Sequence, residues 1–62
     1  SLYEEGQLIV IKETHDIGNV LQLGSNYVLI ETDKGKFRKW LDQIEPLEGS
    51  TKTFKQYEGA TK

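Results

Sequence analysis

The sequence contains no cysteine and no methionine, and it has a single proline and a single histidine among its 62 residues. Without cysteine, neither a disulfide bond nor a thiolate metal site can stabilise the fold. No apolar run approaches the ~18 residues of a membrane-spanning helix and no signal peptide is recognisable, so we expect a cytoplasmic protein with no membrane partner. A domain of this size buries only about 60% of the surface that its unfolded chain exposes. Its stability therefore has to come from a closely packed sheet or from a neighbouring molecule.

Groups that could carry catalysis are also scarce. His15 lies between Glu13 and Asp16 in a polar stretch, which offers too few ligands for a metal site and no nucleophile to activate. The six glycines are scattered, so none of them belongs to a phosphate-binding loop. The formal net charge of −2 argues against a dedicated nucleic-acid binder, since such proteins usually carry a basic excess. We expect no enzyme, no cofactor, no metal and no small-molecule substrate.

The chain instead consists of short β-branched and aromatic segments separated by turn residues, a pattern typical of strands. The predicted strands cover Gln7–Lys12, Asn19–Leu23, Tyr27–Thr32, Lys36–Leu41 and Glu45–Leu47. Between the third and fourth, Asp33 and Lys34 predict a type I hairpin turn in which Gly35 takes a positive φ as a bulge. Asp42 to Ile44 predicts one helical turn capped by Asp42. A short edge strand, which tolerates Pro46, follows that turn.

Several short motifs occur in this order: Gly6-Gln7-Leu8-Ile9-Val10-Ile11, Gly18-Asn19-Val20, Tyr27-Val28-Leu29-Ile30, Gly35, Trp40 and Asp42-Gln43-Ile44-Glu45-Pro46. From about Tyr3 to Glu48 the chain resembles the Src-homology-3-like small barrels, in particular the Tudor and KOW branch. The resemblance implies an all-β fold, with a small five-stranded barrel over residues 1–48 and one short helical turn before the last strand. Residues 49–62 form a polar C-terminal extension. The letters KFRKWL followed by DQIEPL also resemble accessory domains of tailed-phage structural proteins, which implies a place within a viral assembly.

Alternation along the strands divides their residues between two faces. The resemblance implies that the inward residues are Ile9, Ile11, Val20, Val28, Ile30 and Phe37. The outward apolar residues are then Leu8, Val10, Leu21, Leu23 and Leu29. So much exposed apolar surface indicates an interface, unless the register is displaced by one residue, which would exchange the faces. The C-terminal extension is either disordered or docks its aromatic residues Phe54 and Tyr57, which complete the predicted protein interface.

The sequence therefore predicts a non-catalytic interaction module that binds a protein partner or self-associates through an apolar sheet face or a sheet edge. The alternative is a nucleic-acid-binding domain that uses a basic hairpin with an aromatic residue for base stacking: Lys34, Lys36, Arg38, Lys39 and Trp40. The same lysines could simply prevent edge-to-edge pairing of the sheet. Trp40 has two further interpretations. It could be a half-buried lid on the core, or it could form an aromatic patch with Tyr3 and Tyr27 that holds a methylated lysine or arginine.

Overall fold

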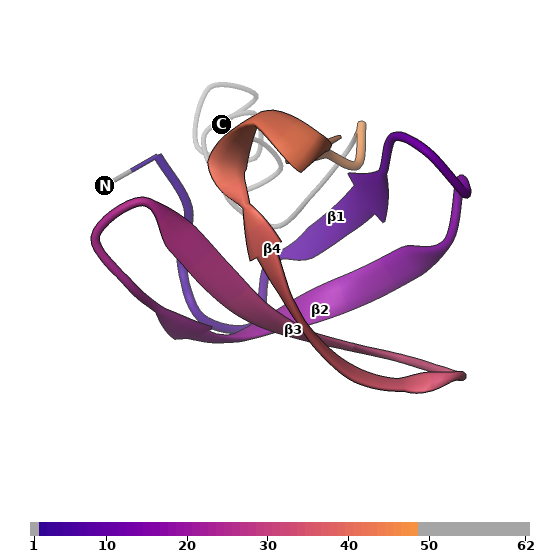
Figure 1. Cartoon of the computed structure of the whole chain (residues 1–62), viewed down its shortest axis with the longest axis horizontal. Helices are drawn as coiled ribbons and strands as arrows, with labels where there is room; N and C mark the ends of the chain where they lie inside the picture. Colours follow the sequence, from indigo (N-terminus) through magenta and orange to yellow (C-terminus); the bar gives the residue numbers. More distant parts are fainter. Residues whose placement is uncertain (1, 49–62) are drawn as a thin grey trace, which may run out of the picture.

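The computed structural model describes residues 2–48 as five antiparallel strands with one short 3-10 turn (Figure 1). The elements in chain order are β1 (Leu8–Ile11), β2 (Ile17–Leu23), β3 (Tyr27–Thr32), β4 (Gly35–Trp40), η1 (Leu41–Gln43) and β5 (Ile44–Pro46). The all-β class and the single helical turn before the last strand are confirmed. The bounds of β3 are as predicted. β1, β4 and β5 differ from their predictions by one residue at each end, and β2 begins two residues earlier than predicted. Phe54, Tyr57 and the rest of the C-terminal extension lie outside the described residues.

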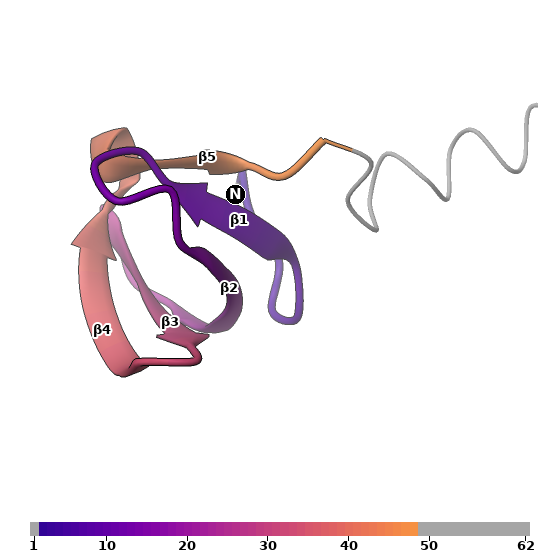
Figure 2. The same cartoon turned by 90° about the vertical axis from the view of Figure 1, so that its right-hand side faces the viewer.

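The strands form one sheet in the order β4-β3-β2-β1-β5. The sheet curls around one side, so that β1 and β5 lie above β3 and β4 in the view of Figure 2. Within residues 2–48, no pairing joins the two edge strands β4 and β5. The sheet is therefore open along the free edge of β4.

The core fills the concave side of the sheet. Its buried apolar residues are Tyr3, Ile9, Ile11, Val20, Val28, Ile30 and Ile44. Five of the six predicted inward residues belong to this core. The exception is Phe37, which is paired with Ile30 and so lies on the inner face, but is 39% exposed. Phe37 is not covered because β4 is an edge strand, and edge residues have a packing neighbour on one side only.

A bulge in β2 changes the predicted faces. Val20 is opposite Ile30 and Leu23 is opposite Val28, so the pairing shifts between Val20 and Gln22. The extra residue is Leu21, which stays exposed, whereas Leu23 packs against the core. The predicted outward orientation of Leu23 is therefore wrong, because strict alternation fails beyond a bulge.

Three local predictions near the turns also need correction. Gly18, which lies just outside the predicted strand Asn19–Leu23, is buried within β2, where a Cβ atom would come 2.8 Å from the Glu31 carbonyl oxygen of β3. Gly35 does take a positive φ of 131°, but the register of β3 with β4 is continuous, so there is no bulge at Gly35. The 3-10 turn begins at Leu41, and Asp42 is not its cap. The side-chain oxygen of Gln43 accepts a hydrogen bond of 2.8 Å from the Trp40 N–H instead.

The turn before β1 is held by a buried glutamine. The Oε1 atom of Gln7 accepts a 3.0 Å hydrogen bond from the Glu4 N–H, and the Gln7 carbonyl accepts one of 2.9 Å from the Val20 N–H. Gly6, at a φ of 87°, allows the sharp change of direction and donates to the Val20 carbonyl. This turn lets Tyr3, which precedes the predicted strands, reach the core.

Candidate protein interface

The outer side of the β3–β4 hairpin carries a fixed group of large side chains. Tyr27 is paired across the strands with Trp40, and Leu29 with Arg38. The Tyr27 and Trp40 rings meet edge to face, with centroids 6.2 Å apart and planes at 87°. The Arg38 guanidinium carbon lies 5.6 Å from the Tyr27 centroid and 5.9 Å from the Trp40 centroid, within the range of cation–π attraction. We call these four residues the hairpin surface.

The position of the Tyr27 ring depends on a glycine. The Gly24 N–H donates a 2.8 Å hydrogen bond to the Tyr27 carbonyl and so closes the turn between β2 and β3. A Cβ atom on Gly24 would overlap the Cζ atom of Tyr27, so the ring lies directly across this residue. Nothing in the sequence shows that the Tyr27 ring requires a residue without a side chain at position 24.

Trp40 remains accessible although it is held in place. Its side chain is 48% exposed, on the outer face of an edge strand, so the predicted role as a lid on the core is wrong. Asn26, Leu41 and Asp42 line an open cavity of about 350 Å³ with it. Tyr3 lies in the core and does not join Tyr27 and Trp40, so the predicted three-residue aromatic patch does not form.

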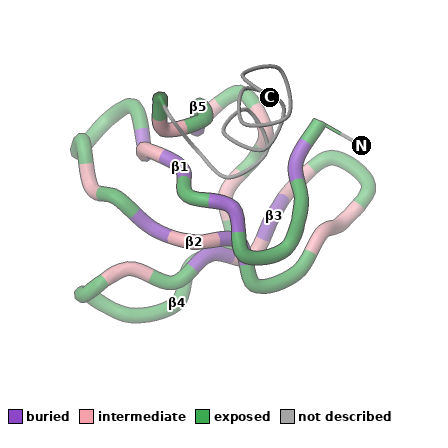
Figure 3. Tube along the Cα trace, turned by 180° about the vertical axis from the view of Figure 1, so that it is seen from behind, coloured by how far each residue is buried: buried purple, intermediate pink, exposed green. Residues whose placement is uncertain are grey.

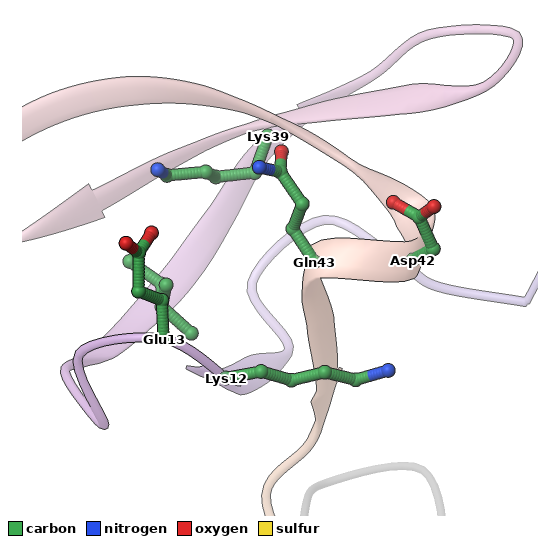
Figure 4. A pocket seen from close by; sticks show the side chains of 6 residues that line it. Lys12, Glu13, Lys39, Asp42 and Gln43 are labelled. Carbon is green, nitrogen blue, oxygen red and sulfur yellow. The ribbon is translucent and has the colours of Figure 1, made fainter.

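A groove lies on the other side of β4, between this strand and the loop that joins β1 to β2. It consists of two adjoining cavities that share Ile11 and Lys39. One of about 300 Å³ is also lined by Lys12, Glu13, Asp42 and Gln43, and one of about 230 Å³ by Thr14, Asp16, Lys34 and Phe37. Figure 4 shows the larger cavity, in which Lys39 and Glu13 extend to the same side and Lys12 to the opposite side. We call this depression the inner groove.

The predicted apolar interface is divided by the structure. Leu8 and Val10 lie on the outer face beside Ile17, which is 53% exposed, and form a β1–β2 patch. A polar row crosses the sheet between this patch and the hairpin surface, through Asn19, Glu31 and Lys36. Leu29 belongs to the hairpin surface. The outer face therefore carries two separate apolar areas, and the hairpin surface is the one with aromatic side chains.

The predicted basic group does not form one surface. The Nζ atom of Lys34 lies 2.9 Å from the Asp16 carboxylate, the one ion pair that the described part of the chain contains. The hydrogen bond between the two side chains lowers the pKa of Asp16 and raises the pKa of Lys34. Lys36 and Arg38 lie on the outer face, opposite Glu31 and Leu29, whereas Lys39 is opposite Val28 on the inner face. The basic charge is therefore spread over two faces of the strand.

Figure 3 shows that buried residues follow β1, β2 and β3, whereas β4 is largely exposed.

Between Leu2 and Glu48 no cluster of His, Asp and Glu side chains could hold a metal ion. No helix in the same range is long and apolar enough to cross a membrane. Comparisons of the chain with protein-family models, curated proteins and solved structures found no match. The interpretation of the surfaces therefore depends on their chemistry alone.

Proposed function

We propose that this domain is a non-catalytic protein-binding module and that the hairpin surface is its contact area. The observation that carries the proposal is the half-exposed Trp40, which Tyr27 and Arg38 hold in one orientation on an edge strand. Trp, Tyr and Arg are the residues most enriched among those that dominate binding energy at protein interfaces. A side chain already fixed in the free protein loses little conformational freedom when a partner covers it.

The charge of this surface favours an acidic partner. Arg38 and Lys36 are exposed neighbours on the outer face of β4. Complementary charge at an interface accelerates encounter and selects among partners. The neighbouring Glu31 and Asp42 reduce the positive field but neither forms an ion pair with Arg38 or Lys36. We therefore expect a protein whose contact region carries carboxylates around an apolar centre.

A nucleic-acid partner is the second candidate, because Arg38 and an exposed Trp40 could contact a phosphate and stack on a base. Two observations place it second. Lys34 is already paired with Asp16, and Lys39 faces the inner groove, so only Lys36 and Arg38 share the outer face. A surface with so few phosphate contacts would bind weakly, with a shallow dependence on salt.

The test is selection of binding peptides from a random linear library displayed on phage, with the full 62-residue chain as the target. Two matched variants replace one exposed apolar residue by threonine: Trp40→Thr in the hairpin surface and Ile17→Thr in the β1–β2 patch. Threonine is a favourable strand residue at both positions, and circular dichroism checks that both variants are folded.

We expect selected peptides to bind the wild type and Ile17→Thr equally and to bind Trp40→Thr at least tenfold more weakly. Truncation of a residue that dominates an interface typically costs about 2 kcal/mol or more, which exceeds a tenfold loss. Peptides that lose affinity only in Ile17→Thr would move the interface to the β1–β2 patch. A chain that selects no peptide but binds single-stranded DNA in a salt-dependent manner would overturn the proposal in favour of the second candidate.

A further inference from the structure

The geometry points to the binding mode: the free edge of β4 accepts an extended segment of the partner as an additional strand, in which acidic and apolar residues alternate. This inference rests on the proposed function, because it assumes that the partner is a protein. It goes further by naming the main-chain groups that pair and the side chains that the partner needs at each position.

The alternation of hydrogen bonds shows which backbone groups of β4 are free. In an antiparallel pair, opposite residues alternately exchange hydrogen bonds and point their main-chain groups away from each other. The Leu41 N–H donates to the Asn26 carbonyl at 3.2 Å, so the next pair, Tyr27 with Trp40, is a non-bonded pair. Counting back in steps of two residues, Arg38 and Lys36 also direct their N–H and C=O groups to the free edge.

The end of this edge is closed by η1. The Trp40 N–H, which points in the same direction as those of Arg38 and Lys36, is taken by the Gln43 side chain at 2.8 Å. Among the turn, loop and cap hydrogen bonds within residues 2–48, none uses a main-chain group of Lys36 or Arg38. A docking strand can therefore pair with the main-chain groups of these two residues. It would not have to displace any of those hydrogen bonds to do so.

The side chains along the edge specify an alternating partner. Partner residues directly opposite Lys36 and Arg38 place their side chains on the outer face, where carboxylates can pair with both cations. The partner residue between them faces inward, over Phe37 and the inner groove, which contains Ile11. An apolar side chain at that position would cover part of the Phe37 ring, which is 39% exposed.

The same charges exclude two other occupants. A second copy paired through β4 would bring the cations Lys36 and Arg38 of both chains together, and like charges on opposite strands are destabilising. Residues 49–62 of this chain carry three lysines and one glutamate, a charge that does not complement the cations of the edge. Charge complementarity therefore favours an acidic segment of a different protein.

The probe is an acetylated and amidated eight-residue peptide of alternating glutamate and valine. Its controls are a peptide of alternating lysine and valine and a peptide with the same glutamates and valines in two blocks. Binding to the full chain is followed by amide chemical shifts and by amide hydrogen exchange. We expect the acidic alternating peptide to bind at least tenfold more tightly than either control. Exchange at Lys36 and Arg38 should slow on binding, with little change at Phe37 and Lys39, whose amides already pair with β3.

Two sets of variants isolate the backbone and the charge. Arg38→Ala removes the side chain, and Arg38→Pro removes the side chain together with the outward N–H, which an edge strand tolerates. We expect Arg38→Pro to bind the acidic peptide several-fold more weakly than Arg38→Ala. The double variant with Lys36→Glu and Arg38→Glu should bind the acidic peptide at least tenfold more weakly than the wild type and bind the lysine peptide more tightly.

Three results would overturn the inference: equal binding of all three peptides, equal binding by Arg38→Ala and Arg38→Pro, or shifts confined to the β1–β2 patch. If Arg38→Pro does not fold, the exchange measurement on the wild type decides the backbone mode. If the acidic peptide does not bind but library-selected peptides depend on Trp40, the strand inference fails and the proposed function stands. If neither class of peptide binds, both fail.

Discussion

The replacement Gly24→Ala provides a sensitive test of how the hairpin surface is held. Gly24 does not occupy the left-handed region, so its backbone can accept alanine, and the three atoms nearest to the new Cβ would all belong to the end of the Tyr27 ring. The ring is a side chain and can swing away, so the fold should survive while the contacts of the ring with Trp40 and Arg38 are lost. The replacement thus perturbs the surface without changing any of its residues.

The expected magnitude follows from two opposing effects. The edge-to-face contact between Tyr27 and Trp40 contributes about 0.5–1.5 kcal/mol, and the exposed cation–π contact with Arg38 about 0.5–1 kcal/mol. Replacing a glycine by alanine stabilises the fold by about 0.4–1 kcal/mol, because the unfolded chain loses freedom. We therefore expect Gly24→Ala to lower the free energy of unfolding by about 1 kcal/mol in the wild type.

A double-mutant cycle with Tyr27→Val makes the test decisive, because the effect should change sign. Without the ring there is no clash and no contact to lose, so Gly24→Ala should then stabilise the protein by about 0.4–1 kcal/mol. Urea unfolding of the four proteins, followed by Trp40 fluorescence and circular dichroism, measures the coupling. Equal effects of Gly24→Ala in both backgrounds would show that the ring does not lie across Gly24 and would refute this account of the surface.

Two further predictions concern the core. Leu23→Ala should destabilise the fold by about 2 kcal/mol, since Leu23 packs on the core, whereas Leu21→Lys in the bulge should change stability by less than about 0.5 kcal/mol. Similar effects of the two in urea unfolding would disprove the bulge. Burial, with a smaller effect of Glu45, raises the pKa of Tyr3, so the unfolded chain ionises first and stability falls as the pH rises above about 10. Tyr3→Phe should lose this part of the alkaline destabilisation, and identical pH profiles of the two proteins would contradict the placement of Tyr3.

Period-2 alternation was sufficient to predict most of the core, because β1 and β3 are regular and pair on both sides. It could not predict that Leu23 turns inward, since the bulge at Leu21 arises from the pairing of β2 with β3 and has no signature in either segment alone. It predicted the face of Phe37 correctly but not its exposure of 39%, because burial depends on which strands become edges. Tyr3 is missed because it reaches the core through the turn at Gly6 and lies outside every strand.

The candidate surface was visible in the sequence only as a run of basic and aromatic residues. Its division between two faces follows from alternation along β4, but the partners of its side chains come from elsewhere in the chain. Lys34 does not contribute a free charge to the basic surface, because it pairs with Asp16, which is 18 residues away in sequence. Arg38 and Trp40 meet Tyr27 only because the hairpin register is continuous. Such pairings depend on three-dimensional register, which composition and local pattern do not specify.

The open edge connects the stability of this domain with its proposed binding. A small sheet without disulfides buries little apolar surface, and here the partly exposed Phe37 belongs to β4, which pairs with β3 on one side and has a free edge on the other. A partner strand would cover that ring and supply hydrogen-bonding partners for the main chain of Lys36 and Arg38, so it would bind the folded state and not the unfolded one. Mass action then requires that the partner stabilise the fold, by about 2.7 kcal/mol at a hundredfold excess over its dissociation constant. Lys36 and Arg38, the cations that disfavour pairing of this edge with a second copy, are thus the same groups that would select an acidic strand to complete the sheet.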